Sequence, residues 1–175
     1  FEPIGTDSSF SFQGTFDGQG HIISNLTMNS SSWYVGLFGY SNKSIIKNIV
    51  LDSSCSIVSS FIGDFPCVGG IIGDCESENG DCVIESTVNM ASVSFTGKAD
   101  NKLFFGGAAG ILHTRNNNIA SIRNFANYGS ITLSGKAENA YIGGIVGESD
   151  GSSSNSAYIQ NCLSYGTITY NGTAN

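Results

Sequence analysis

The chain has 175 residues, of which 40% are hydrophobic and only 12% charged, and its net charge is -7. This length is sufficient for one domain with its own core. Seven basic residues cannot form the cationic stripe that nucleic acids or anionic membrane surfaces require, and no apolar run approaches the roughly 20 residues of a membrane-spanning helix. We therefore expect neither nucleic acid binding nor membrane insertion.

After an opening segment, residues 1–33, a G-x-x-G motif with an aromatic or apolar lead-in recurs along the chain. The bounding glycines of its four copies are Gly36 and Gly39, Gly70 and Gly73, Gly107 and Gly110, and Gly144 and Gly147. The first glycines are separated by 34, 37 and 37 residues. Self-similarity at a fixed period is the signature of a repeat architecture.

A second motif runs in phase with the first. Its central isoleucines, separated by 38, 38 and 37 residues, are Ile46, Ile84, Ile122 and Ile159. The two signals together divide the chain into N-terminal coils at 1–33 and successive repeats at 34–66, 67–103, 104–140 and 141–175. We predict a single domain over 1–175 that forms part of a longer chain or of an assembly.

The local pattern of each repeat favours short strands over helices. Apolar stretches are β-branched and alternate with polar residues, as in Ser130-Ile-Thr-Leu133, and paired glycines would weaken a helix by about 1 kcal/mol each. Because such a unit cannot bury its apolar side alone, we predict an all-β fold, a right-handed parallel β-helix or β-solenoid with repeats of about 37 residues. Taking each repeat as two coils of about 18 residues gives nine or ten coils, with rungs ~4.8 Å apart. Asn48, Asn124 and Asn161 are expected to form part of an internal amide ladder, interrupted by Ser86.

The glycine motifs resemble the GLUG repeats of large bacterial and protist surface proteins, as in Gly36-Leu-Phe-Gly39 and Gly70-Ile-Ile-Gly73. The opening Phe12-Gln-Gly-Thr-Phe-Asp-Gly-Gln-Gly-His is similar to the coil that precedes such repeats. The resemblance covers nearly the whole chain. It implies a right-handed parallel β-helix in an adhesin or another extracellular structure, a further strand ahead of Phe1, and no shared catalytic motif.

The cysteines and four sequons favour a secretory, glycosylated origin, and the alternative is that the sequons are chance matches in a bacterial surface protein. Cys75 and Cys82 flank an acidic loop and are predicted to bridge, Cys55 and Cys67 are a second candidate pair, and Cys162 is predicted to be a buried free thiol. The candidate N-glycosylation sites are Asn25, Asn29, Asn42 and Asn171.

No catalytic, cofactor or metal site is predicted. A polysaccharide-active enzyme would need paired carboxylates, for which the candidates are Asp17, Asp52, Asp64 and Asp74. These aspartates are also explained by turns and loop caps. The two histidines, His21 and His113, lie far apart in sequence, and no C-x-x-C pair indicates zinc. Three carboxylates between Cys75 and Cys82 make this segment a candidate calcium site, but a solvated acidic loop is the simpler interpretation.

We therefore expect a non-enzymatic, extracellular or cell-surface structural and adhesive module, in one version a glycosylated filament subunit. Its expected partners are other copies or neighbouring domains of its chain, through the solenoid ends, together with glycans. One alternative is a carbohydrate-binding module, to which the exposed tyrosines and the Ser130-Ile-Thr132 and Thr167-Ile-Thr169 rows point, although two rows are too few for a flat binding face. A polysaccharide-active β-helix enzyme is the third alternative.

Overall fold

The computed structural model describes residues 1–151 and 155–172, and every regular element in these ranges is a β-strand. Within these ranges no helix is long and apolar enough to cross a membrane. All strands pair in parallel, and they form three sheets that wind into a β-solenoid of about four turns. The all-β parallel solenoid predicted from the repeat is confirmed.

Sheet A has 11 strands and forms two layers. Its upper layer contains β10 (Ile72–Ser77), β14 (Ala109–Thr114) and β18 (Val146–Gly151). Its lower layer contains β1 (Phe12–Asp17), β2 (Ile22–Ile23), β6 (Val50–Leu51), β11 (Cys82–Asn89), β15 (Ile119–Asn127), β19 (Ser156–Gln160) and β20 (Leu163–Ser164). The long strand β5 (Phe38–Lys47) joins the layers by pairing with both β10 and β11.

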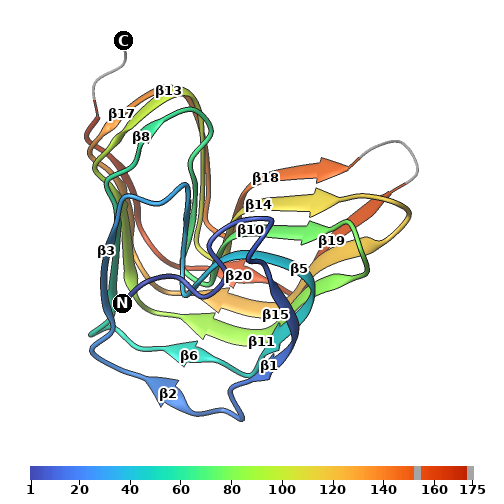
Figure 1. Cartoon of the computed structure of the whole chain (residues 1–175). Coiled ribbons are helices and arrows are strands. Elements are labelled where there is room, and N and C mark those ends of the chain that lie inside the picture. Colours follow the sequence, from blue (N-terminus) through green and yellow to red (C-terminus); the bar gives the residue numbers. More distant parts are fainter. Residues whose placement is uncertain (152–154, 173–175) are drawn as a thin grey trace.

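Sheets B and C complete the coils, with five strands each. Sheet B contains β3 (Thr27–Ser30), β7 (Ser56–Ser59), β12 (Ser92–Phe95), β16 (Ile131–Leu133) and β21 (Ile168–Tyr170). Sheet C contains β4 (Tyr34–Val35), β8 (Ile62–Gly63), β9 (Cys67–Gly69), β13 (Lys98–Gly106) and β17 (Lys136–Gly143). Each coil thus passes through sheet C, runs outward in the upper layer of sheet A, returns in the lower layer and continues into sheet B (Figure 1).

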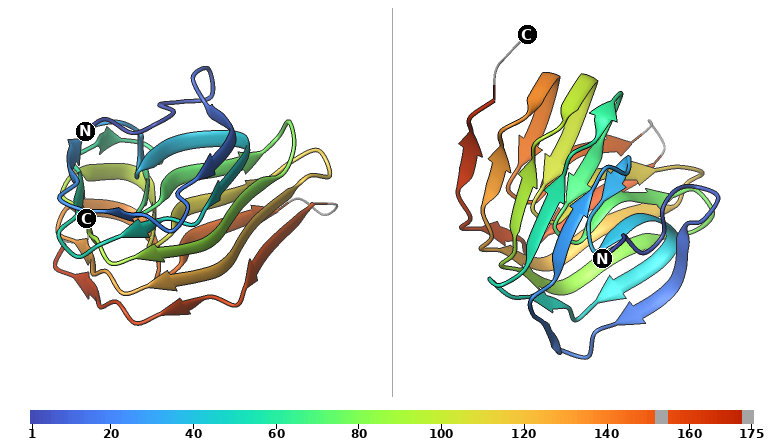
Figure 2. Two further views of the ribbon diagram at one scale, coloured as in Figure 1. Left: turned by 90° about the horizontal axis from the view of Figure 1, so that it is seen from below. Right: turned by 60° about the vertical axis from the view of Figure 1, so that its left-hand side comes forward.

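One repeat of about 37 residues makes one coil. Ile84 pairs with Ile46 on one side and with Ile122 on the other, and Ile122 pairs with Ile159, so residues one full repeat apart lie on adjacent rungs. Figure 2 shows the successive coils stacked along one axis, from blue to red. The predicted coil of about 18 residues, and with it the count of nine or ten coils, is wrong. The outward-and-back excursion in sheet A uses the additional residues.

Aligned apolar side chains form the core of this stack. Ile46, Ile84 and Ile122 are all 0% exposed, and Phe38 and Phe125 are nearly as completely buried. Burying one such side chain stabilises the fold by about 1.5–3 kcal/mol relative to exposure. Each coil contributes one residue to each column. That residue is therefore fully buried only when there is a coil both before and after its own.

The last glycine of each G-x-x-G motif lies where sheet C turns into the upper layer of sheet A. A Cβ atom added to Gly39, Gly73, Gly110 or Gly147 would lie 2.8–3.1 Å from the carbonyl oxygen of the residue that begins the motif's lead-in, such as Cys67 for Gly73. Only glycine allows the backbone to approach so closely. The first glycines of the four motifs do not all occupy the same position in their coils. Gly70 and Gly107 face Asn89 and Asn127, whereas Gly36 precedes that position and is level with Gly69.

The internal amide ladder consists of other residues than those predicted. The buried Asn89 donates from Nδ2 to Oδ1 of Asn127 at 2.9 Å, and its own Oδ1 accepts from the backbone N–H of Ala91. Of the predicted asparagines, Asn161 does donate to Oδ1 of Asn124 at 3.4 Å, but this bond lies on the exposed surface, where the two residues have φ near +52° and +51°. Asn48 donates to Asp17 instead. Asparagine tolerates this left-handed conformation better than most residues, which explains its recurrence there.

Candidate functional site

The most polar arrangement in the structure lies at the concave corner where sheet C meets the upper layer of sheet A. Sheet C contributes the outward-facing column Tyr34, Cys67, Phe104 and Tyr141. The upper layer contributes the facing column Tyr40, Asp74, Ile111 and Glu148. Cys67, Phe104 and Ile111 pack together there, with Tyr34 against them. Side chains that point away from the coil interior are therefore buried by the bend between the two sheets.

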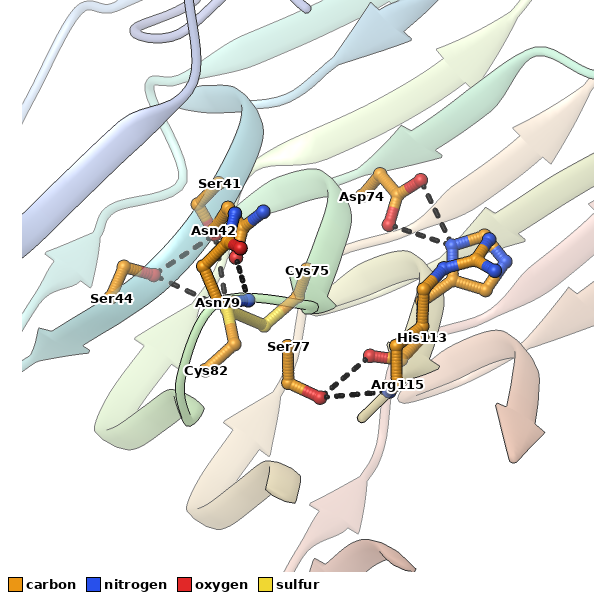
Figure 3. The surroundings of a disulfide bond; sticks show 10 residues. All are labelled: Ser41, Asn42, Ser44, Asp74, Cys75, Ser77, Asn79, Cys82, His113 and Arg115. Atoms are coloured by element: carbon orange, nitrogen blue, oxygen red, sulfur yellow. Dashed lines mark hydrogen bonds and ion pairs between the residues drawn. A yellow bond between two sulfur atoms is a disulfide. The ribbon is translucent and has the colours of Figure 1, made fainter. Parts of the chain in front are cut away.

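Asp74 of this corner pairs with His113 of the next coil (Figure 3). Asp74 is 3% exposed, and both of its oxygens lie 3.2 Å from Nδ1 of His113 in the next coil. The other ring nitrogen, Nε2, lies 3.6 Å from an oxygen of Asp150, one coil further along. His113 thus bridges carboxylates of the two coils on either side of its own.

Burial and neighbouring charges act on both groups. Burial raises the pKa of Asp74 above its ordinary value, and the hydrogen bond from His113 opposes that shift. Burial alone would lower the pKa of His113, but the hydrogen bond to Asp74 and the charges of Asp74 and Glu76 raise it overall. A histidine between two carboxylates favours its protonated form, which donates from both ring nitrogens.

A second ion pair lies beside the first. The Arg115 guanidinium donates from Nε to Oε1 of Glu76, a carboxylate that is 7% exposed. Each buried carboxylate of the upper layer therefore has a cationic partner in the next coil. Burial raises the pKa of the neighbouring Cys67 thiol, which disfavours the thiolate that a nucleophile would require. This arrangement cross-links coils, and it can bind and release one proton at His113.

Cys75 and Cys82 form the disulfide predicted from their spacing, with their Cα atoms 6.1 Å apart. It joins the outgoing strand β10 to the returning strand β11. The hydroxyls of Ser41 and Ser44 lie 3.1 and 3.2 Å from the sulfur of Cys82, in the coil below (Figure 3). Because a disulfide sulfur has no proton and Ser44 donates its hydroxyl proton to Oγ of Ser41, the donor to the sulfur is Ser41.

Two of the three carboxylates of this loop bond within the protein. Glu76 pairs with Arg115, and Oδ1 of Asp81 accepts from the backbone N–H of Ile119. Among the residues that the structure describes, no group of three or more His, Cys, Asp or Glu side chains is arranged to hold a metal ion.

The second predicted disulfide is wrong, because its two cysteines lie in different clusters. Cys55 belongs to the main core and donates to the carbonyl of Ile23, whereas Cys67 lies in the concave corner. Cys162 is a free thiol as predicted, but it is only partly buried. Its coil is covered on one side only.

The four sequon asparagines differ in accessibility. Asn25 lies exposed at a turn, and Asn29 points outward from β3. Asn171 is exposed as well, although the Thr173 of its sequon lies outside the described residues. Asn42 is 5% exposed, and its Oδ1 accepts from the backbone N–H of Asn79. A glycan on Asn42 would disrupt this packing, so the prediction for Asn42 is wrong for the folded chain, and the other three stay predictions.

The four candidate catalytic aspartates lie apart. Asp17 accepts from Asn48, and this hydrogen bond lowers the pKa of Asp17. Asp52 accepts from Ser24, with the same effect on its pKa. Asp64 lies exposed between β8 and β9, and Asp74 lies in the concave corner. None of the four is bonded to another of the set.

Sequence reasoning missed the pairing of Asp74 with His113, which are 39 residues apart. Their separation is one repeat plus two residues. Because one repeat makes one coil, this offset places the two side chains on neighbouring rungs, two positions apart along the strand. The separation in sequence was therefore the signal that could have predicted the pair.

The hydroxyl rows of sheet B are longer than predicted. The outward-facing column that contains Thr132 and Thr169 continues through Ser94, so hydroxyls occupy three rungs of it, and the next two rungs carry Val58 and Asn29. The expectation of only two rows followed from the similarity of two repeats in sequence. Register shows that dissimilar repeats continue the same column.

A comparison of the chain with protein-family models, curated proteins and solved structures finds no match.

Proposed function

We propose that the chain is an extracellular structural and adhesive module that extends by stacking coil on coil. The observation that supports this most directly is the state of the last coil. Ile159 is 44% exposed, although its column partners Ile46, Ile84 and Ile122 are 0% exposed. Ile168 is 47% exposed, against 1% for Ile131 in the preceding coil. Apolar columns therefore end in solvent, and a further coil on this face would bury them.

The backbone of the same coil supports this proposal. Strands β17, β18, β19 and β21 are each paired on one side only. A row of free N–H and C=O groups is a template for a further parallel strand. Apolar columns and strand edges on one face favour a partner that repeats both patterns, namely another coil of the same kind.

The first coils differ from the last. Ile4 accepts from the backbone N–H of Gly39 and donates to the carbonyl of Leu37, so the opening segment adds a rung to the upper layer of sheet A. Met28 of β3 is 0% exposed. The two ends of the stack thus present different surfaces. A contact between unlike ends is heterologous, and a heterologous contact that does not close into a ring produces a filament.

The GLUG resemblance and the chemistry of the surface support the extracellular part of the proposal. The disulfide between Cys75 and Cys82 is typical of an oxidising compartment. Asn25 and Asn29 are exposed in sequons, and a Ser- and Asn-rich surface with few charged residues accommodates glycans. On this reading the chain has no catalytic role, and its partners are further coils of its own kind.

The test is sedimentation velocity over a range of protein concentrations. The wild type should form larger species as its concentration rises, and Ile159→Asp, which places a charge on the open face, should stay monomeric. The matched control is Ile45→Asp, because Ile45 is an exposed isoleucine of β5, a strand that is paired on both sides and so belongs to neither end of the stack. A wild type that is monomeric at every concentration, or an Ile159→Asp variant that assembles like wild type, would contradict the proposal.

A further inference from the structure

A hollow of about 190 Å³ lies on the outer face of the lower layer of sheet A, between β15 and the last-coil strand β19. It is lined by Ile119, Ser121 and Arg123 of β15 and by Tyr158 and Gln160 of β19. Ser121 is level with Tyr158, and Arg123 is level with Gln160. The hollow exists because the small serine lies among four longer side chains that stand around it.

Ser121 lines this hollow, and its buried hydroxyl has no partner. Ser121 is 1% exposed, and its Oγ makes no hydrogen bond in the structure. A buried polar group without a hydrogen bond costs about 1–3 kcal/mol, and most such groups in folded proteins are satisfied. The oxygen lies beneath the longer side chains that line the hollow, so a ligand reaches and satisfies it when one of the exposed ones moves aside.

Arg123 is also without an intramolecular partner. Three other cations of the chain pair with carboxylates, as Lys47 does with Asp17 and Arg115 with Glu76. Arg123 makes no hydrogen bond or ion pair within the described part of the chain, and the same is true of the Gln160 amide. A guanidinium with free donors is suited to bind a carboxylate through two parallel hydrogen bonds.

We propose that this hollow binds one carboxylated sugar residue of an acidic polysaccharide. Arg123 and Gln160 donate to the carboxylate, the Ser121 hydroxyl bonds a ring substituent, and Tyr158 and Ile119 contact the apolar face of the ring. The volume of about 190 Å³ is below the roughly 300–1,000 Å³ of pockets that bury drug-sized ligands, so it suits a single ring.

The net charge of -7 opposes an anionic ligand at long range. At physiological ionic strength that repulsion is screened over about 8 Å, whereas the contacts in the hollow act at hydrogen-bond distance. The site is built from outward-facing side chains of the last two coils, whereas the proposed stacking uses the columns that end at Ile159 and Ile168. It gives the proposed adhesive module a partner of defined chemistry.

The test is a titration of ¹⁵N-labelled protein, followed by its backbone amide signals, with sodium D-glucuronate, D-glucose and sodium acetate. Glucuronate should shift the signals of Ser121, Arg123 and Tyr158 with one saturable curve, and glucose and acetate should each bind at least about tenfold more weakly, because each supplies half of the contacts. Arg123→Gln should weaken glucuronate binding about tenfold or more.

Lys136→Gln is the matched control, since it removes one exposed positive charge from sheet C, outside the hollow. It should leave the affinity for glucuronate unchanged. Equal binding of glucose would overturn the role of the carboxylate, and equal binding of acetate would overturn the role of the ring. No saturable shift at tens of millimolar glucuronate, or equal weakening by both substitutions, would overturn the site itself. Because Arg123 is exposed, the variant should keep the wild-type signal dispersion, which the same spectra verify.

Discussion

The isoleucine column allows a quantitative prediction about stability, because its members are the same residue at the same repeat position and differ in how many neighbouring coils bury them. We consider Ile84→Ala and Ile159→Ala, which remove the same atoms from the same repeat position. Ile84 is 0% exposed and lies between Ile46 and Ile122 on adjacent rungs, whereas Ile159 is 44% exposed and has a column neighbour on one side only.

The expected magnitudes follow from this difference. Ile84→Ala loses the full transfer free energy and leaves a cavity closed by a residue above and below, so it should destabilise by about 3–5 kcal/mol. Ile159→Ala loses only the buried part of its transfer free energy and leaves no closed cavity, so about 1 kcal/mol is expected. In a repeat protein the cost follows the number of neighbouring interfaces, which is two for Ile84 and one for Ile159.

Urea unfolding of dilute, monomeric protein, followed by circular dichroism, measures both values. The unfolding midpoint of Ile84→Ala should fall several times further than that of Ile159→Ala, with unchanged slopes. Equal shifts would refute the reasoning, because they would mean that the coil of Ile159 is as well covered as the coil of Ile84.

Three further predictions concern cross-links, the amide ladder and pH. Reducing the Cys75–Cys82 disulfide should destabilise the fold by about 2–3 kcal/mol, as measured by thermal melting with and without dithiothreitol, and an unchanged melting temperature would contradict this. Asn89→Ala leaves the N–H of Ala91 unpaired in the core, so it should cost about 2–3 kcal/mol in urea unfolding, against at most about 0.5 kcal/mol for the exposed Asn139→Ala. Because the folded pKa of His113 is raised above 6.5, the stability it contributes is full below pH 6.5 and is lost as pH rises through the folded value. Urea midpoints of the wild type should therefore fall over that range relative to His113→Gln, and parallel pH profiles would show that His113 is not the cause.

The sequence was sufficient to predict the parallel solenoid, because two motifs repeat in phase and short strands alternate between them. It was not sufficient to predict the number of coils. A period of about 37 residues is compatible with one long coil or with two short ones. The coil is long because the chain turns back after β10 and returns as β11 within the same coil. The repeats differ in loop length and composition there, as Cys75 and Cys82 illustrate, so no common motif marked the turn.

The same distinction between local and inter-coil features separates the site residues that could be predicted from those that could not. The Cys75–Cys82 bridge was predictable because it is local, whereas the Asp74–His113 pair joins neighbouring coils and required the register. The hollow around Ser121 could not be predicted from any motif. It follows from the size difference between Ser121 and its neighbours across two coils, and only the alignment of β15 with β19 brings those residues together.

Electron cryo-microscopy of the native material, with the intact mass of its subunit, tests the central claim most directly. We predict filaments in which each subunit adds its first coils to the open β17–β21 face of the next, with carbohydrate density at Asn25 or Asn29. Discrete single-chain particles with an unmodified mass would contradict both the stacking and the glycans.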